Sequence, residues 1–538
     1  MAALFTTPKR NDKTSGAHFI EPDVRRRTLL ARGSWSRVTR RIVCGLACAL
    51  TVSSLLMPSV SLAAEWVNVG GTQYEFGTKA GDEAGTWSWD GADDMKLNGY
   101  NGGAIQAEGK LNVSYSGNNT ITNENGCGVS VTKDANENAE LNIQGDASST
   151  LNVTSNDDAI ISDGDINIDG AGTVNATSTE FDAIDAGGDL TIKGGGTVEA
   201  SSIEDVAIWA GGNIDISGGS QVKANSNVNY AVDAEGGLTV TNASLNAHGV
   251  GCGVYVCNGV TLDHATVTVR AAAGRDETIA LCTEEGDIAI MNGSTADAFA
   301  EGKDSAAIFT RNYNPNEAGG HVYISDSVVK AIARYAETGG DGPDCYATDQ
   351  DGEITPERRG VNIGVFAQTS EGIMPATISI VRSKVTAEGD TAAIFALAMS
   401  ADGKAIGTIE IEGASILTPE GGKVIDYRHK EELRDGTVYE AGQAIGTGDA
   451  VIDSPYDDVI AKKAVIAPSE ETKPEDSKPD SKPEGTKTTK TVAAVATEAK
   501  TTGKLAATGD ASSAAIVAAS LAGTAVIAAG AVVSRKRS

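Results

Sequence analysis

Three consecutive segments of 24 residues decide the fold: DINIDGAGTVNATSTEFDAIDAGG (165–188), DLTIKGGGTVEASSIEDVAIWAGG (189–212) and NIDISGGSQVKANSNVNYAVDAEG (213–236). They align without a gap. Each contains an alternating apolar–polar strand, a glycine-rich corner, a second strand, a polar corner and a short run of the form Ala-Ile/Val-x-Ala. Short alternating runs between glycines predict half-buried strands. Repetition at a fixed period in the twenties predicts a stacked array with one coil per repeat.

The same pattern extends in both directions along the chain. One aliphatic position per coil recurs at Ile105, Val129, Ile160, Ile184, Ile208, Val232, Val254, Ile279, Ile308, Val365 and Ile394. A second strand accompanies each of them, from Leu111/Val113 to Ile409/Ile411. We therefore expect an all-β chain with about eleven coils, roughly 50 Å long at ~4.8 Å per coil. Three strands per coil favour a right-handed parallel β-helix, the architecture of pectate-lyase-like proteins, over a left-handed helix with hexapeptide repeats.

Composition supports strands and turns and excludes one class of partner. The chain has 63 Gly, 13 Pro and a formal net charge of −30. Nucleic acid is excluded as a partner, because binding phosphates requires a basic face. An acidic surface of this kind is typical of a well-solvated protein, and it also suits divalent cations such as Ca²⁺.

The segments around the coils predict a domain order. Residues 64–100 break the period and carry three tryptophans, which suits an N-terminal cap of the solenoid. Coils are expected over 101–430, with a loop insertion near 335–359, and a C-terminal cap over 431–466. Residues 467–504 are rich in Pro, Lys, Glu and Thr and cannot bury a core, so we expect a disordered stalk.

The N-terminal segment has the features of a secretory signal. A basic stretch is followed by an apolar run from Ile42 to about Val60 and then by Ser61-Leu62-Ala63. This order predicts a signal peptide over 1–63, cleaved after Ala63. The chain is therefore expected outside the cell. Sec export is favoured, and twin-arginine export remains open because of Arg40 and Arg41.

The C-terminal segment predicts how the exported chain is held. An apolar stretch over 511–533 ends in a basic tail, as in a membrane stop signal. The pentapeptide before it is Leu505, Ala506, Ala507, Thr508 and Gly509. Residues 505–538 resemble the Leu-Pro-x-Thr-Gly sorting signal of Gram-positive surface proteins, in the Leu-Ala-x-Thr-Gly form of some actinobacteria. This resemblance implies a sortase as partner and linkage of Thr508 to cell-wall peptidoglycan. An ordinary tail anchor is the alternative.

The coils themselves resemble repeat domains of wall-anchored proteins from Gram-positive gut bacteria, which are often described as carbohydrate-binding. The residue after each aliphatic position should point outward. On four successive coils it is Asp185, Trp209, Asp233 and Tyr255. Aromatic rings can stack on sugars and carboxylates can accept hydrogen bonds from hydroxyls. We therefore expect an exposed strip that binds a glycan or another host surface ligand, although these residues could equally be covered by a loop.

A catalytic alternative is a polysaccharide lyase or glycoside hydrolase on the same scaffold. Asp157, Asp158 and Asp182 stack on neighbouring coils, with Asp185 nearby. Paired carboxylates could hydrolyse glycosidic bonds or hold Ca²⁺ for a lyase. However, the five histidines are scattered, no Arg/Lys cluster accompanies the aspartates, and stacked corner aspartates commonly serve as turn residues. The sequence favours a non-catalytic protein with no cofactor.

Five cysteines remain after the signal, at 127, 252, 257, 282 and 345. Alignment of the coils places Cys257 and Cys282 at the same position of successive coils, about 5 Å apart, which permits a disulfide. Two buried small residues in one column are the alternative. No Cys-x-x-Cys pair is present, so a zinc site is not expected.

Overall fold

The computed structural model describes residues 64–273, 278–303, 305–312, 320–336, 362–369, 376–398, 407–417, 423–427, 444–446 and 458–469. The predicted signal (1–63), most of the 335–359 insertion, the stalk from 470 onward and the sorting signal lie outside these residues. The chain divides into two compact units, 1–471 and 472–538, and every described residue belongs to the first. Within these ranges, no helical segment has the length and apolar character that a membrane crossing requires.

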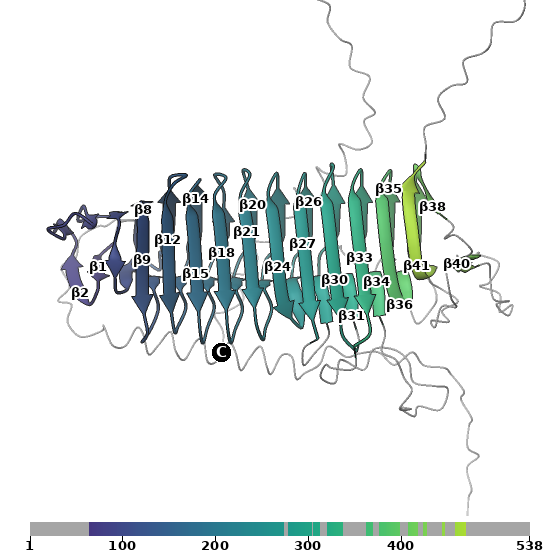
Figure 1. Ribbon diagram of the computed structural model, residues 1–538, viewed down its shortest axis with the longest axis horizontal. Helices are drawn as coiled ribbons and strands as arrows, with labels where there is room; N and C mark the ends of the chain where they lie inside the picture. Colours follow the sequence, from purple (N-terminus) through teal and green to yellow (C-terminus); the bar gives the residue numbers. More distant parts are fainter. Residues whose placement is uncertain are drawn as a thin grey trace, which may run out of the picture. The chain divides into compact units, whose positions relative to one another are not determined.

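The described residues form a parallel β-helix, which confirms the predicted fold class. Strands of successive coils lie side by side in three parallel stacks (Figure 1). We call these stacks the A, B and C faces. The chain visits them in the repeating order A, B, C, and each strand pairs with its equivalents in the coils before and after it.

The A face carries the predicted aliphatic position. Its strands are β7 (Ile105–Glu108), β10 (Val129–Thr132), β13 (Ile160–Ser162), β16 (Ile184–Ala186), β19 (Ile208–Ala210), β22 (Val232–Ala234), β25 (Cys252–Val256), β28 (Thr278–Thr283), β31 (Ser305–Asn312), β34 (Asn362–Thr369) and the second half of β36 (Lys384–Ala398).

The B face is a separate sheet. Its parallel strands are β5 (Asp94–Asn98), β8 (Lys110–Ser116), β11 (Glu140–Gly145), β14 (Asp165–Gly170), β17 (Leu190–Ile192), β20 (Ile214–Ser217), β23 (Leu238–Thr241), β26 (Val260–Asp263), β29 (Ile288–Met291), β32 (Val322–Ser325), β35 (Thr377–Val381) and β37 (Thr408–Glu412). The eleven strands from β8 to β37 match the predicted number of coils.

The C face completes each coil. Its strands are β6 (Asn101–Gly102), β9 (Asn118–Asn123), β12 (Thr150–Ser155), β15 (Thr173–Ser178), β18 (Thr197–Ser202), β21 (Gln221–Ser226), β24 (Ser244–Val250), β27 (Thr266–Ala272), β30 (Thr295–Glu301), β33 (Val328–Arg334) and the first half of β36.

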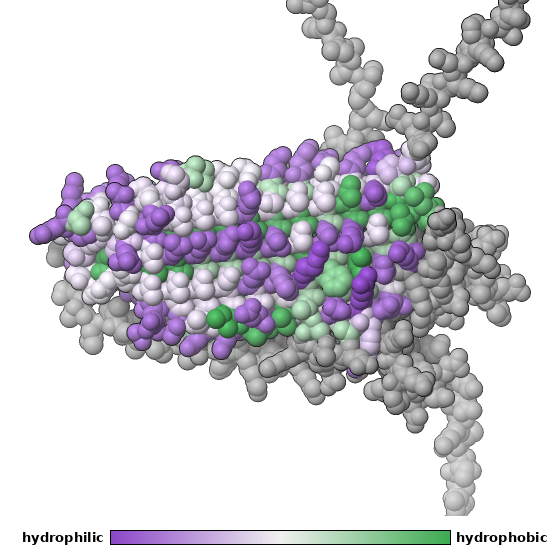
Figure 2. All heavy atoms as spheres, viewed as in Figure 1, coloured by the Kyte–Doolittle hydropathy of each residue, from purple (hydrophilic) through white to green (hydrophobic). Residues whose placement is uncertain are grey.

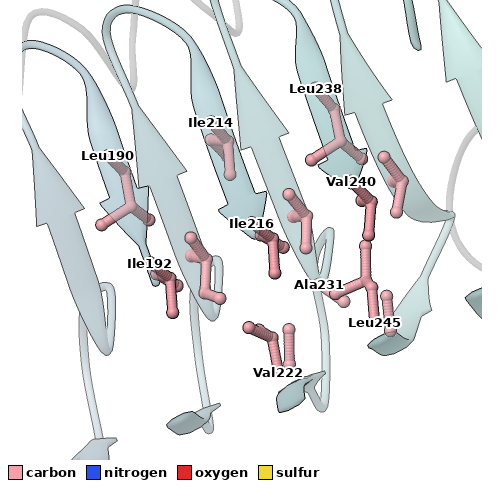
Figure 3. Close-up of a cluster of buried hydrophobic side chains, with 14 of the residues drawn as sticks. Leu190, Ile192, Ile214, Ile216, Val222, Ala231, Leu238, Val240 and Leu245 are labelled. Carbon is pink, nitrogen blue, oxygen red and sulfur yellow. The ribbon is translucent and has the colours of Figure 1, made fainter. Parts of the chain in front are cut away.

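The interior is one continuous apolar core. Alternate residues of every strand point inward, where side chains such as Leu190, Ile214 and Leu238 stack directly above one another (Figure 3). All three are at most 1% exposed. No coil could bury these residues alone, so each coil depends on its neighbours.

One corner of the coil places a residue at positive φ in nearly every turn. Between the B and C faces this residue is glycine in the exact repeats, for example Gly194 and Gly218. Later coils place Asn242, His264 and Arg382 there, also with positive φ. Glycine adopts this left-handed conformation without a steric penalty, which explains why this corner is glycine-rich in the 24-residue repeats.

Non-repeating strands cover both ends of the solenoid. At the N-terminal end, β1 (Trp66–Val69) pairs antiparallel with β2 (Thr72–Glu75) and with β7 of the first coil. The short strands β3 (Ala80–Gly81) and β4 (Trp87–Trp89) extend the B sheet before β5. At the other end, β41 (Asp458–Pro468) runs antiparallel along β36 and meets β38 (Ala414–Leu417) and β39 (Lys423–Tyr427), which pairs with β40 (Ala444–Gly446). Antiparallel cover of this kind blocks edge-to-edge pairing.

The predicted register is wrong in one coil. Val254 pairs with Leu281, and Ile279 pairs with Cys252, so the inward residue of this coil is Leu281. The outward residue that follows it is consequently Cys282 and not Ala280. The same shift of two residues places Cys282 opposite Tyr255 and away from Cys257. No disulfide joins Cys257 to Cys282.

Candidate functional site

The predicted strip lies on the outer side of the A face, with its members in direct register. Asp185 pairs with Trp209, Trp209 with Asp233, and Asp233 with Tyr255. Successive members are therefore one strand spacing apart, about 4.8 Å. Each member lies on a strand of three to five residues, and the residues next to it on that strand point into the core and hold it in place. The alternation of carboxylate and aromatic side chains predicted from the sequence is real.

The strip is less exposed than predicted. Asp185 is only 4% exposed and Tyr255 only 8%, while Trp209 and Asp233 are half-buried. The prediction that all four residues are exposed is therefore wrong for Asp185 and Tyr255. Trp209 and Asp233 form the part of the strip that retains accessible surface.

Tyr255 belongs to a polar–aromatic group that sequence reasoning missed. Its ring stacks on Tyr230 of the preceding coil, with centroids 5.5 Å apart and planes 29° apart. Burial, with Glu284 of the next coil as a second cause, holds the pKa of Tyr255 well above its ordinary range. The phenol therefore stays protonated and can act as a hydrogen-bond donor. Glu284 also pairs with Arg311, at 2.5 Å.

Beyond Tyr255 the outer side of the A face becomes apolar. Phe309, Phe366 and Phe395 stack on successive coils, with centroid distances of 4.9 and 5.3 Å. Each is about 5% exposed, and with Cys282, Ile279 and Ile363 they form a second core outside the interior of the solenoid. Phe366 and Phe395, which follow the aliphatic positions Val365 and Ile394, are therefore buried and not part of an exposed surface. The outer A face thus changes from the alternating carboxylates and aromatic rings of the strip to an apolar surface in the later coils.

The aspartates considered for catalysis act at the corner between the C and A faces. Asp158 accepts a hydrogen bond from the backbone N–H of Asp182 at 3.0 Å. Asp182 in turn accepts one from the N–H of Val206 at 3.1 Å. These bonds run from one coil to the next at an interval of 24 residues, so the carboxylates satisfy backbone donors that the coil leaves unpaired at its corner.

The carboxylates at this corner lie close to one another. Oxygen atoms of Asp158, Asp182 and Asp185 lie within 4.8 Å of one another. Asp182 is also only 2% exposed. Three oxygen ligands this close together could hold a Ca²⁺ ion, and among the described residues they form the most buried such group.

A small polar cavity lies beside this corner. Its volume is about 240 Å³, and it is lined by Glu124, Asn125, Gly126, Asn156, Asp157, Glu180 and Phe181. The sulfur of Cys127 and carboxylate oxygens of Asp157 and Asp158 also lie within 4.8 Å of one another. The residues that line the cavity are acidic or neutral and include no histidine or lysine. Their oxygen atoms can accept hydrogen bonds from hydroxyl groups or contact a cation, but they would repel an anion.

Among the described cysteines, Cys257 shows no sign of nucleophilic activation. Burial, followed by the charge of Glu284, raises the pKa of Cys257 to about 12. A thiol with such a pKa stays protonated at neutral pH and is a poor nucleophile. Cys252 and Cys282 are buried in the apolar outer cluster.

Two parts of this face escaped sequence reasoning for different reasons. Tyr230 occupies the same place in its coil as Asp182 and Val206, three residues before the outward position of the strip, so the 24-residue period could have found it. The pair of Glu284 and Arg311 could not have been found in this way, because irregular spacing precedes both coils.

Comparison with known proteins identifies no relative. No family model, no curated protein and no solved structure matches this chain.

Proposed function

We propose that this chain is a cell-wall-anchored surface protein whose solenoid binds glycans without cleaving them. The proposal of export and anchoring is supported by the order of signal segment, coils, stalk and Leu505–Gly509 pentapeptide in the sequence. Sortase and peptidoglycan are the partners that this order implies, and the exported chain would be displayed on a Gram-positive cell.

The binding proposal is carried by the register of Trp209 and Asp233 on adjacent strands of a rigid sheet. An indole ring offers a flat apolar face to a sugar, and a neighbouring carboxylate accepts hydrogen bonds from its hydroxyls. Both groups are held by a filled core, so little conformational entropy is lost when a ligand binds. The surrounding side chains Asp185 and Glu235 add negative charge, which favours neutral or cationic sugars over acidic ones.

The second candidate function is that of a surface lyase or hydrolase. The group of carboxylates near Asp158 is the observation that favours it. The deciding experiment incubates the full-length chain with host and plant glycans, with and without Ca²⁺, and follows both retention and chain cleavage. We expect retention without new reducing ends or unsaturated products. Cleavage products that disappear in Asp158→Asn would establish the enzyme instead.

A further inference from the structure

The C face of the first three coils carries an outward surface without any charged residue. Its outward positions hold threonine and asparagine only, and we call them the neutral grid: Asn118, Thr120, Thr122, Thr150, Asn152, Thr154, Thr173, Asn175 and Thr177. In a chain with a net charge of −30, a neutral area of this size is distinctive. The outward side of the B face in the same coils is charged, for example by the Lys110–Glu140 pair.

The grid is in strict register from coil to coil. Thr150 pairs with Thr173, and Asn152 pairs with Asn175. The hydroxyl and amide groups of the grid therefore form parallel rows across the strands. Along the row of strands from β9 to β24, Figure 2 shows pale surface on either side of a single hydrophilic row. Charge returns in the fourth and fifth coils, where Glu199 pairs with Lys223 at 2.5 Å.

The side chains of the grid are ordered before any ligand binds. The amide of Asn175 donates to the Oδ1 of Asn152 at 2.8 Å, and the amide of Asn152 donates to the backbone oxygen of Asn119 at 3.2 Å. These two bonds fix the amide planes. The β-branched threonines have restricted χ1 rotamers. A ligand therefore meets hydroxyl, methyl and amide groups whose ordering costs little on binding.

These features define the chemistry of the ligand. A surface with hydroxyl and amide groups but no charge gives an ionic polymer no countercharge, whereas it matches the hydroxyls of a neutral sugar. Because the same groups repeat from coil to coil, the surface suits an extended chain better than a single sugar. Its repeat of about 4.8 Å per coil is close to the length of one sugar unit in an extended polysaccharide. We propose that the neutral grid binds a neutral polysaccharide that runs along the solenoid axis, with about one sugar unit per coil.

This surface is separate from the strip around Trp209, so the two proposals can fail independently. The test uses affinity electrophoresis of the full-length chain in gels with galactomannan or mixed-linkage β-glucan as neutral probes, and polygalacturonate or chitosan as charged ones. The variant Thr154→Lys/Thr177→Lys places two cations on the grid at exposed or half-exposed positions that tolerate polar side chains. The matched control, Thr191→Lys/Thr239→Lys, makes the same change on the B face.

We expect the grid variant to lose about tenfold in affinity for a neutral probe, with the control unchanged. Affinity should also rise with the length of the oligosaccharide until it spans the grid. Equal binding by the grid variant and the wild type would overturn the proposal, as would binding to charged probes alone or to no probe. If Trp209→Ala lost all glycan binding while the grid variant lost none, the strip would be the binding site and the proposal for the grid would be wrong.

Discussion

Tyr115 shows how single residues are matched to one another inside the solenoid. Its ring lies in the interior, and its hydroxyl donates to the backbone oxygen of Thr173, two coils away, at 3.2 Å. Gly145 sits opposite it in the neighbouring strand, and Gly172 lies next to its hydroxyl. These glycines are present because the tyrosine ring fills the space that a Cβ atom would need.

Gly145→Ala should therefore destabilise the solenoid. The added Cβ atom would overlap the ring of Tyr115, and overpacking of this kind costs about 1–3 kcal/mol. Gly126→Ala is the matched control, because its added Cβ would meet only the amide of Asn123, at 3.4 Å. Urea denaturation of both variants measures the difference. Equal free energies of unfolding would show that the interior adjusts to the methyl group.

Asp287 gives the stability a dependence on pH. Burial raises the pKa of its carboxyl, although the neighbouring His321 and its backbone N–H act in the opposite direction. The folded state therefore binds a proton at a pH where the unfolded state does not. Stability from this group is gained as the pH falls through the folded pKa and lost as it rises. Asp287→Asn should weaken this gain, because the amide keeps the oxygen that accepts from His321 without the charge.

The exposed carboxyl of Asp326 has a pKa that is shifted in the opposite direction to that of Asp287. Two hydrogen bonds from Arg382, at 2.8 and 2.6 Å, lower its pKa. Its contribution to stability is present above the unfolded pKa and is lost as the pH falls through the folded pKa. Thermal melting of wild type, Asp287→Asn and Asp326→Asn across the acidic range separates the two contributions. Identical pH profiles for wild type and Asp287→Asn would contradict the role given to Asp287.

At the scale of elements, the corner between the C and A faces depends on carboxylates that link successive coils. Asp158→Ala removes the acceptor for the N–H of Asp182 and should cost about 1–3 kcal/mol. Asp158→Asn keeps an oxygen in place and removes one of three close carboxylates, so its melting temperature should equal or exceed that of the wild type. Differential scanning calorimetry of both variants tests the turn role.

The same variants examine the cation alternative. A cation that binds only the folded state raises the melting temperature. We expect neither Ca²⁺ nor a chelator to shift the melting temperature of the wild type. A Ca²⁺-dependent rise that is absent in Asp158→Asn would assign Asp158, Asp182 and Asp185 to a metal site.

Elements were predictable where one side of a strand is polar. The columns from Ile105 to Val254 were placed correctly because polar outward residues mark each strand. The error occurred in β28, where both sides are buried and Ile279 and Leu281 are both aliphatic. With apolar residues on both faces, alternation no longer distinguishes inside from outside. Leu281 follows alanine, whereas Ile279 follows Thr278, and the other inward residues of this column follow alanine or glycine, so the preceding small residue is the local signal that could have corrected the register.

At the scale of the whole molecule, sequence periodicity could establish which residues share a column but not what covers that column. It aligned Asp185, Trp209, Asp233 and Tyr255 correctly. It did not reveal that Asp185 and Tyr255 are buried, because burial on an outer face depends on contacts between segments distant in sequence. The same limit applies to the aromatic stack of Phe309, Phe366 and Phe395.

The proposed display on the cell wall depends on residues that lie outside the described ranges. Thr508→Ala should prevent transfer of the chain to the wall, because the proposed linkage uses the Thr508 carboxyl. The protein should then appear in the membrane or the medium when cell fractions are probed. The comparison is Thr502→Ala, a nearby threonine outside the pentapeptide. Unchanged wall attachment of the Thr508 variant would refute sortase anchoring.

The central claim is that the solenoid binds glycans through the strip around Trp209. The most direct test is calorimetric titration of the full-length chain with a glycan that it retains, for wild type, Trp209→Ala and Phe76→Ala. Phe76 is 57% exposed and lies in the N-terminal cap, away from the A face strip, so it controls for the loss of an accessible aromatic ring. Loss of a stacked ring should weaken binding by about tenfold in Trp209→Ala and leave Phe76→Ala unchanged. Equal affinity of wild type and Trp209→Ala would contradict the account.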